Sequence, residues 1–513
     1  MKRKKSNLGI VIAGLLLGIL MGSMDSTIVA TAMGTIVGEL GGLDKFVWVT
    51  SAYMVAELAG VPIFGKLSDM YGRKRFFVFG LLVFIIGSAL CGTANSITEL
   101  ALYRAIQGIG AGAIIPIAFT IMLDVVPLES RGKFGGIFGS IFGLSSIFGP
   151  LLGAYITDYI KWQWIFYINL PVGVMAVLMI VFFYKESHEH SKQPIDWAGA
   201  FTLIGAVVCL IFMLELGGKQ FAWDSAAILG LFAGFILLAI AFLIIEAKVK
   251  EPIISYSLFK NRLYTTSILI SLFSGAAFIV ASVYIPIFIQ GVFGGKATDS
   301  GLVLLPMMLA SVVTAMIGGF VINKVSYRSV MISTLLVLVA GVVLASTLKS
   351  DSTRWLITLS MILIGSGIGS SFSVLGNAVI HGVVARQRGT ANSTLTFVRA
   401  LGMTIGITTF GIIQSQLFSN KLANYLQSMG GKDAQLPKGL DMKDPHILLS
   451  PETREHIPHE ILDQMKNMLS DSITHTFAWA IIPASLAFFI SFFMGRSKLD
   501  ASANADEEYV SGH

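Results

Sequence analysis

The chain has 513 residues, of which 54% are hydrophobic and only 13% are charged, and its mean hydropathy is +0.77. Soluble domains carry roughly 25% charged residues, so this composition excludes a large soluble protein and predicts an all-α polytopic membrane protein. The net charge of +6 does not indicate nucleic acid as a partner, because basic residues gathered in membrane loops produce the same balance.

The apolar segments of the chain are candidates for membrane-spanning helices, each of which needs about 20 mostly apolar residues. Fourteen segments meet this need, at residues 8–37, 46–64, 76–94, 99–123, 135–157, 163–184, 197–216, 226–246, 263–290, 301–322, 329–348, 354–376, 390–416 and 473–494. Lys and Arg gather in the loops on the side that carries the N-terminus. Because cytoplasmic loops collect these residues, both termini are expected in the cytoplasm.

The fourteen segments predict two six-helix bundles, the arrangement of a transporter built from two related halves. The expected divisions are an N-terminal bundle at 8–184, a linker with two inserted spans at 185–262, a C-terminal bundle at 263–494 and a cytoplasmic tail at 495–513. The C-terminal bundle contains a long hydrophilic segment, 417–471, which is expected outside the cell. Apolar residues at helical spacing in its second half predict an amphipathic helix on the outer surface.

Residues 65–75, Gly-Lys-Leu-Ser-Asp-Met-Tyr-Gly-Arg-Lys-Arg, form a distinctive polar stretch between two apolar segments. Charges are costly in hydrocarbon, so a tight cytoplasmic loop is expected here. A preference for cytoplasmic cations does not explain an acid placed midway between a glycine and an arginine. The motif residues are Gly65, Asp69, Gly72, Arg73 and Arg75, and their expected partner is Asp124 at the cytoplasmic end of the fourth segment.

Three ionisable residues lie deep in predicted spans, where each is a functional candidate by default. Asp25 and Arg104 both fall in the outer half of the membrane, so they are expected to approach each other. A carboxylate balanced between burial and a neighbouring cation can take up and release a proton, although a static ion pair between two helices explains the same residues. Glu57 lies near mid-membrane, where it is expected to titrate, to attract a cationic substrate or to hydrogen-bond the backbone.

Other polar residues in the spans are candidates for a substrate cavity, namely Gln107, Asn377 and Arg399. The acids Asp25 and Glu57 favour cationic or zwitterionic substrates, whereas Arg399 and Asn377 suit an anionic group equally well. The sequence alone leaves both alternatives open.

No cofactor or metal is expected. Gly108, Gly110 and Gly112 resemble a packing face, because they lack the strand–loop–helix context of a nucleotide-binding loop. The two cysteines, Cys91 and Cys209, lie inside apolar segments and have no metal-site spacing.

Several of these motifs together resemble the signatures of the major facilitator superfamily. They are the Asp69 stretch, Arg104-Ala-Ile-Gln107-Gly108 in the fourth segment, and Gly149-Pro150-x-x-Gly153 in the fifth. The third makes the fifth segment glycine-rich and broken by proline, and it is similar to the antiporter signature of exporters. The chain also resembles the fourteen-helix drug:proton antiporters of the EmrB/QacA type. The resemblance lies in Met24-Asp25-Ser26-Thr27, in Trp162-Gln-Trp-Ile-Phe-Tyr-Ile-Asn-Leu-Pro171 and in the two inserted segments.

The resemblance implies alternating access, in which an inward proton drives an outward drug, so that a proton gradient and not a cofactor supplies the energy. It implies a proton-coupling role for Asp25 and Arg104. It also implies a cytoplasmic latch formed by Asp69, Arg73, Arg75 and Asp124. One position departs from the family, which usually has Trp-Arg-Trp before the sixth helix, because Gln163 replaces the arginine.

The sequence therefore predicts a monomeric multidrug exporter of the plasma membrane, with small amphipathic drugs and protons as partners. An exporter of one antibiotic or one endogenous metabolite explains the same residues. A membrane-embedded enzyme would need a polar or metal cluster at a membrane face, and the isolated His381 and His475 provide none. The absence of a large cytoplasmic domain argues against a sensor that does not transport.

Overall fold

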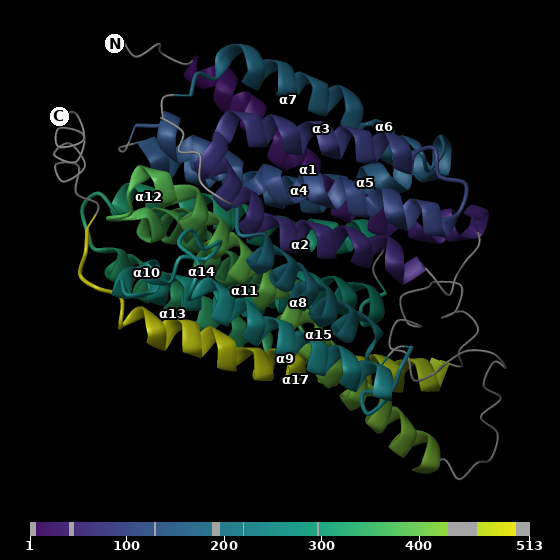
Figure 1. Cartoon of the computed structure of the whole chain (residues 1–513). Helices are drawn as coiled ribbons and strands as arrows, with labels where there is room; N and C mark the ends of the chain where they lie inside the picture. The colour runs from purple at the N-terminus through teal and green to yellow at the C-terminus, as the bar shows by residue number, and fades with distance from the viewer. Residues whose placement is uncertain are drawn as a thin grey trace, which may run out of the picture.

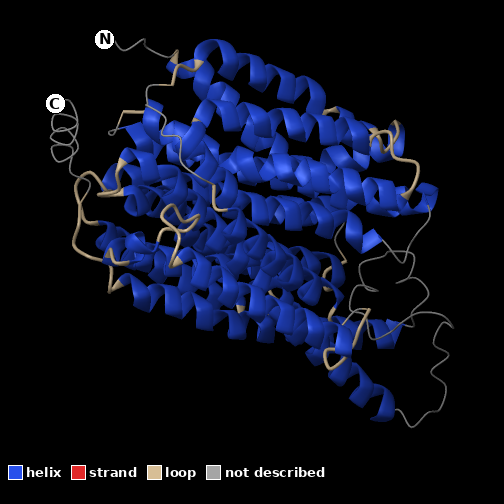
Figure 2. Ribbon diagram, in the orientation of Figure 1, coloured by secondary structure: helices blue, strands red, loops and turns tan. Residues whose placement is uncertain are grey.

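The protein is a bundle of long helices that run side by side, as Figure 1 shows. The structure is a computed structural model, and it describes residues 7–40, 46–127, 130–186, 195–218, 220–294, 297–428 and 459–498. Figure 2 shows these residues as helices joined by loops, and the β pairing among them is an isolated bridge between Gly217 and Phe221.

The helices fall into two halves and an inserted pair. The N-terminal half, purple to blue in Figure 1, contains α1 (Leu8–Leu40), α2 (Phe46–Tyr71), α3 (Arg73–Cys91), α4 (Ile97–Val125), α5 (Arg131–Tyr159), the short α6 (Trp164–Tyr167) and α7 (Asn169–Phe183). The inserted pair is α8 (Trp197–Leu216) and α9 (Ala226–Glu246), followed by the short α10 (Tyr256–Phe259). The C-terminal half, teal to yellow, contains α11 (Arg262–Gly291), α12 (Ala297–Val321), α13 (Tyr327–Ala345), α14 (Arg354–Ile380), a 3₁₀ turn at Ala385–Gln387, α15 (Arg388–Ser428) and α17 (His459–Ser491).

Short polar side chains define where some helices begin. The Ser96 hydroxyl accepts a hydrogen bond from the Glu99 N–H at 3.2 Å at the start of α4. The Asn261 side chain accepts one from the Leu263 N–H at 2.9 Å at the start of α11. Such caps satisfy first-turn N–H groups that have no partner within their own helix.

Twelve helices of the described residues are long and apolar enough to cross a membrane. The sequence predicted fourteen spans, and α2 and α5 account for the difference. α2 contains Glu57, Lys66 and Asp69, and the apolar run found in α5 is the shorter Phe148–Thr157. The predicted sixth span is interrupted at Ile168, which separates α6 from α7 within one apolar stretch.

The same helix pairings occur in both halves. In the N-terminal half α4 packs against α2 and α3, and α1 packs against α5 and α7. In the C-terminal half α14 packs against α12 and α13, and α11 packs against α15 and α17. The halves meet where α5 packs along α12 and where α2 packs along α15, and these two contacts are equivalent when the halves are exchanged. The molecule is thus a pseudo-twofold repeat, as in transporters that duplicate one helical unit.

The inserted pair lies beside the α2–α15 contact. Leu203 and Val207 of α8 share one apolar cluster with Leu58 and Val61 of α2 and with Phe397 of α15. α9 packs against the outer side of α8 and leaves most of its apolar surface exposed. α8 therefore covers one of the two seams between the halves.

Two predicted connections differ in the structure. Residues 65–75 do not form a loop, because α2 continues to Tyr71, α3 begins at Arg73 and Gly72 alone lies between them. Continuing the helices satisfies backbone groups that a loop would leave open at the membrane surface. α5 is not broken by proline, because it runs as one helix through Pro150.

The hydrophilic segment predicted at 417–471 is shorter in the structure, because α15 continues to Ser428 and α17 begins at His459. The start of the predicted amphipathic helix lies outside the described residues, and its remainder is the first part of α17. Ile461, Met465 and Leu469 of that part are buried, where α17 packs against α11 and α15. Their helical spacing thus marks an internal packing face and not a separate surface helix.

Glycine allows α3 and α4 to approach closely. A Cβ atom at Gly110 would lie 2.5 Å from the Phe84 nitrogen and 2.6 Å from the Gly80 oxygen. Both are backbone atoms, so they cannot rotate away. Gly230 on α9 is the opposite case, because a Cβ atom there would have nothing within 4 Å.

We predict that Gly110→Ala lowers the free energy of unfolding by about 1–3 kcal/mol, the usual cost of overpacking. Gly230→Ala, the matched control, should leave it unchanged or slightly higher because alanine favours helix. Thermal unfolding of the detergent-purified variants, followed by tryptophan fluorescence, measures the difference. Equal melting temperatures for the two variants would contradict the close packing of α3 on α4.

Candidate functional site

A buried ion pair joins α1 to α4. Asp25 is 0% exposed and Arg104 is 1% exposed, and the Arg104 guanidinium forms an ion pair with the Asp25 carboxylate. The contact that the sequence predicted between these two residues is therefore present. A buried charge without a partner costs several kcal/mol, so each residue makes burial of the other tolerable.

Amide and hydroxyl groups complete the surroundings of Asp25. Gln107 Nε2 donates to Asp25 Oδ1 at 2.8 Å, and Asn169 Nδ2 donates to the same oxygen at 3.1 Å. Both amides also donate to Ser88 Oγ, at 3.1 Å and 3.0 Å. Arg104 donates in turn to Gln107 Oε1 at 2.7 Å. The carboxylate on α1 thus receives hydrogen bonds from α4 and α7 in a network that α3 also joins.

Aromatic rings enclose the cation of this network. The Arg104 guanidinium carbon lies 3.9 Å from the centroid of the Tyr53 ring and 6.0 Å from that of Phe166. A ring face attracts a cation most strongly where water is excluded, and Tyr53 is 1% exposed. Because Asp25 and Arg104 are both closed off from solvent, proton exchange at Asp25 requires the surrounding helices to move.

Glu57 lies one helical turn after Tyr53 on α2, so both side chains lie on the same face of that helix. Unlike Asp25, it is partly exposed, and none of the ion pairs among the described residues includes it. The structure thus places Glu57 beside the buried network but not inside it.

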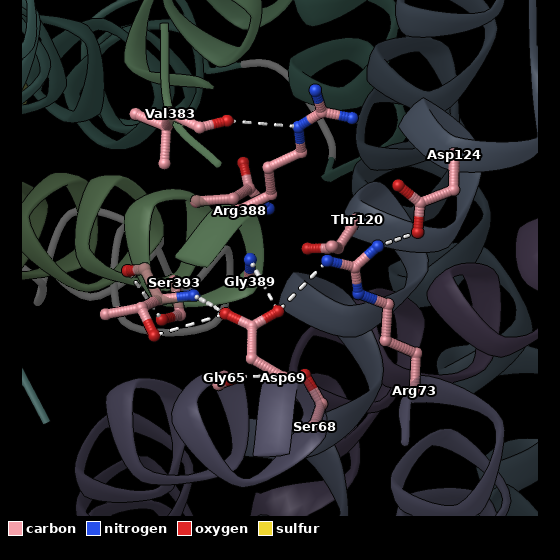
Figure 3. A network of polar contacts seen from close by, with 12 residues as sticks. Gly65, Ser68, Asp69, Arg73, Thr120, Asp124, Val383, Arg388, Gly389 and Ser393 are labelled. Atoms are coloured by element: carbon pink, nitrogen blue, oxygen red, sulfur yellow. Dashed lines mark hydrogen bonds and ion pairs between the residues drawn. The ribbon is translucent and has the colours of Figure 1, made fainter. Parts of the chain in front are cut away.

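A second polar network joins the two halves at the end of α2, as Figure 3 shows. The Asp69 carboxylate accepts hydrogen bonds from the Gly389 N–H at 2.9 Å, the Thr390 N–H at 2.7 Å and the Thr390 hydroxyl at 3.2 Å. Gly389 and Thr390 belong to the first turn of α15, whose N–H groups lack partners in their own helix and form the positive end of its dipole. An acid of the N-terminal half therefore caps a helix of the C-terminal half.

Arg73 holds Asp69 in this position. Its Nη2 donates to Asp69 Oδ1 at 3.0 Å, and its guanidinium also pairs with Asp124 at the end of α4 (Figure 3). The side chains of all three residues are at most 6% exposed. Asp124 therefore lies against a motif cation, as its position along the fourth segment predicted. The Arg73 backbone N–H donates to the carboxylate of Glu186, which follows α7.

The segment after α9 adds an ion bridge beside this network. Glu251 Oε2 lies 2.7 Å from Lys66 Nζ on α2, and Glu251 Oε1 lies 3.0 Å from Arg386 Nη2 just before α15. Glu251 thus contacts both halves at once. The Arg386 side chain is 47% exposed, so this arm is the weaker one, because solvent screens exposed pairs to about 0–1 kcal/mol.

The motif glycines have two different roles. A Cβ atom at Gly65 would lie 2.1 Å from Ser393 Oγ, so glycine at this position lets α2 lie against the first turns of α15. Gly72 has a φ of +115°, a conformation that L side chains rarely adopt. It provides the sharp change of direction between α2 and α3.

Arg75 does not belong to the network in which the sequence placed it. It is exposed, and it forms none of the ion pairs found among the described residues. The neighbouring Lys74 instead donates to the carbonyl oxygens of Val181 and Tyr184, each at 2.7 Å. Arg75 lies in the first turn of α3, and its side chain is exposed to solvent, whereas that of Arg73 is buried.

Gly149 and Gly153 bring α5 against α1. A Cβ atom at Gly149 would lie 2.0 Å from Thr27 Oγ1, and one at Gly153 would lie 2.2 Å from Thr31 Oγ1. Pro150 lies between them within the continuous helix. Gly149 and Gly153 thus pack directly on the helix that carries Asp25, at positions two and six residues after that acid.

The three predicted cavity residues do not lie together. Asn377 and Arg399 line one pocket, which is bounded by α4 and α5 on one side and by α14 and α15 on the other. Gln107 does not reach that pocket. It is 0% exposed and belongs to the Asp25 network, because its side chain points into the N-terminal half.

Sequence reasoning missed several residues that the structure brings to these networks, among them Tyr53, Ser88, Asn169 and Glu251. A polar residue in an apolar span was the available signal for Ser88 and Asn169. Glu251 had no such signal, because its two partners are separated from it by 185 and 135 residues. Within the described ranges, no three His, Cys, Asp or Glu side chains are arranged to hold a metal ion.

We predict that Asp25→Asn and Arg104→Gln each destabilise the protein, by about 3–5 kcal/mol where the remaining charge stays buried and unpaired. The double variant should lose less than the sum of the two single losses, because it leaves no orphaned charge. Unfolding of all four proteins in one detergent measures this coupling. Strictly additive losses would contradict a direct ion pair.

We also predict that Asp69→Asn loosens the contact between the halves, because a neutral amide cannot accept all the hydrogen bonds made by the α15 N-terminus and Arg73. A cysteine at Asn377, introduced in a variant without Cys91 and Cys209, should then react several-fold faster with a water-soluble maleimide. Asp463→Asn, at an exposed acid of α17, is the matched control and should leave the rate unchanged. Equal rates in both backgrounds would contradict the role of the cap.

Comparison with known proteins agrees with this architecture. The sequence profile of the Major Facilitator Superfamily matches residues 15–407. Multidrug resistance protein 3 of Bacillus subtilis is 50% identical over 500 residues, with 98% of each chain covered. Multidrug transporter protein MdtP of the same organism is 37% identical over 521 residues, covering 98% of this chain and 96% of the relative.

Two solved structures share the fold at low sequence identity. The human organic anion transporter MFSD10 (TETRAN) superposes with a TM-score of 0.58 at 16% identity, covering 94% of this chain and 100% of that one. The proton:xylose symporter XylE superposes with a TM-score of 0.57 at 13% identity, covering 96% of each chain. On the family match and these similarities, the chain belongs to the major facilitator superfamily, whose members are multi-pass membrane transporters of small molecules and not enzymes.

Proposed function

We propose that this protein is a drug:proton antiporter of the plasma membrane. It exports amphipathic cationic or zwitterionic compounds while protons move inward, and it uses no cofactor. Two relatives that carry multidrug names, at 50% and 37% identity over nearly the whole chain, support the export of drugs. It acts as a monomer, with each of its two halves contributing to one translocation path.

We further propose that fourteen helices cross the membrane, as in the EmrB/QacA type, with both termini in the cytoplasm. α2 and α5 have 26 and 29 residues, which at 1.5 Å per residue is about 39 Å and 44 Å and exceeds the hydrocarbon thickness. Both pack along helices that are apolar enough to span, α2 against α4 and α5 against α1 and α12. The excess of Lys and Arg on the Asp69 side of the bundle supports that side as the cytoplasmic one.

The Asp25 carboxylate is the observation that carries the proton-coupling proposal. It lies inside a membrane bundle, and its negative charge is balanced by Arg104 and by two amide donors. A small separation of α1 from α4 removes that balance and favours the protonated acid, whereas closing restores the carboxylate. Such a group takes up and releases a proton as α1 and α4 move apart and together within the N-terminal half. Glu57, near the same network and without an ion-pair partner among the described residues, is the second candidate.

The energy available from protons fits export against a gradient. One charge that crosses about 100 mV provides roughly 2.3 kcal/mol, and about 1.4 kcal/mol corresponds to a tenfold concentration ratio. Exchange of more than one proton for each drug molecule would therefore sustain a drug gradient of a few powers of ten.

We predict that ethidium, added to proteoliposomes with an imposed pH gradient, causes proton movement through the wild-type protein and none through Asp25→Asn. A dye sensitive to pH inside the vesicles measures the flux. Asp463→Asn is the control for the loss of an acid elsewhere and should keep the wild-type flux. Substrate-driven flux that survives Asp25→Asn but not Glu57→Gln would move the coupling role to Glu57. No proton response in the wild-type protein to ethidium, to a zwitterionic drug or to a neutral drug would overturn the antiporter proposal.

A further inference from the structure

Arg399 differs from the other deeply placed arginines because no acid neutralises it. It lies eleven residues after the start of α15, about 16 Å along the helix, and it is partly buried. Arg73 and Arg104 each pair with a carboxylate, but none of the ion pairs among the described residues includes Arg399. An unpaired charge at this depth is costly.

Neutral groups alone contact the Arg399 guanidinium within the described residues. Its Nε donates to Ser271 Oγ at 3.3 Å, and its Nη2 donates to the Ser371 carbonyl oxygen at 3.4 Å. Both hydrogen bonds are long. The guanidinium carbon lies 4.7 Å from the centroid of the Phe372 ring. These contacts orient the planar group and leave most of its five N–H donors available.

Asn377 supplies an independent sign of an unfilled polar site in the same pocket. This side chain is 3% exposed, and its Nδ2 donates to the Ser373 carbonyl oxygen at 2.7 Å. Its Oδ1 is buried and accepts no hydrogen bond from any of the described residues. A buried acceptor without a donor is unfavourable, and this pocket presents such an acceptor together with a cation.

The pocket lies on the contact between the halves. Phe119 of α4 and Gly135 of α5 line it from the N-terminal half, opposite Asn377 and Arg399 of the C-terminal half. At its edge, Asn392 Nδ2 on α15 donates to the Pro116 carbonyl oxygen on α4 at 3.1 Å. In this arrangement the pocket holds a cavity of only about 20 Å³, so a compound larger than a water molecule enters when the halves separate.

We propose that this pocket binds the carboxylate of a transported compound on Arg399, with a hydrogen-bond donor of the same compound on Asn377 Oδ1. The planar guanidinium donates in pairs to a carboxylate, which a point charge cannot do. Phe372 and Phe119 provide aromatic surface for the rest of the molecule. The inference rests on the proposed export function and assigns the tighter binding, among the exported compounds, to those that carry a free carboxylate, zwitterions above all.

The test compares two fluorescent compounds that differ only at the proposed contact. One is a rhodamine with a free carboxylate, and the other is its methyl ester, in which the same position is neutral. Fluorescence polarisation measures the binding of each to the full-length protein in lipid nanodiscs, without any transport. The variants are Arg399→Gln, Arg399→Lys and, as a matched loss of one exposed cation on α14, Arg354→Gln.

We expect the wild-type protein and Arg354→Gln to bind the acid at least about tenfold more tightly than the ester, the size of one charge-assisted hydrogen bond. Arg399→Gln should abolish this preference by weakening the acid alone, and Arg399→Lys should keep part of it. Equal affinity of the wild-type protein for acid and ester overturns the inference without any variant. A preference that Arg399→Gln leaves intact also overturns it, and export of drugs stands in both cases. Binding of neither compound by the wild-type protein overturns the inference together with the proposed substrate class.

Discussion

At the first turn of α15, the Asp69 carboxylate accepts the hydrogen bonds that water would otherwise accept. The contact between the halves depends on these hydrogen bonds. Backbone N–H groups at the start of a helix need acceptors, and here the acceptor comes from the other half of the molecule. The Arg73 guanidinium neutralises this acid and also forms an ion pair with Asp124. Because Gly65 leaves room for Ser393, α2 comes close enough for the cap to form. One acid thus links the end of α2, the start of α3 and the end of α4 to a helix about 320 residues away.

The two buried acids respond differently to relative motion of the halves. The described groups that pair with or donate to Asp25 belong to the N-terminal half, so a rigid rotation of one half against the other leaves these contacts intact. The contacts of Asp69 cross between the halves, so the same rotation breaks them. α4 connects the two sites, because Arg104 and Asp124 lie twenty residues apart on it, or about 30 Å. A change at Asp25 that shifts α4 therefore has a direct mechanical route to the cap.

The sequence predicted contacts that follow from charge in an apolar span and missed those that depend on the fold. A buried Asp25 carboxylate needs a cation beside it, and Arg104 lies at the same predicted depth in the membrane. Asp124 lay one helix length from Arg104, which placed it beside Arg73. Nothing local indicated that the partner of Asp69 is the backbone of Gly389 and Thr390, because a backbone N–H carries no sequence signature. Gln107 was predicted to line a cavity because a polar residue in a span needs polar partners. The direction of its side chain depends on how α3, α4 and α7 pack, and the sequence does not show this.

The position of α8 makes the two seams between the halves unequal. The pseudo-twofold repeat alone would leave the α2–α15 contact and the α5–α12 contact equally open to the surrounding lipid. α8 covers the first with Leu203 and Val207 against Leu58 of α2 and Phe397 of α15. On one side of the molecule three helices, α2, α15 and α8, pack together between the halves and the bilayer. On the other side α5 and α12 form the contact. The inserted pair thus covers the α2–α15 contact and leaves the α5–α12 contact uncovered.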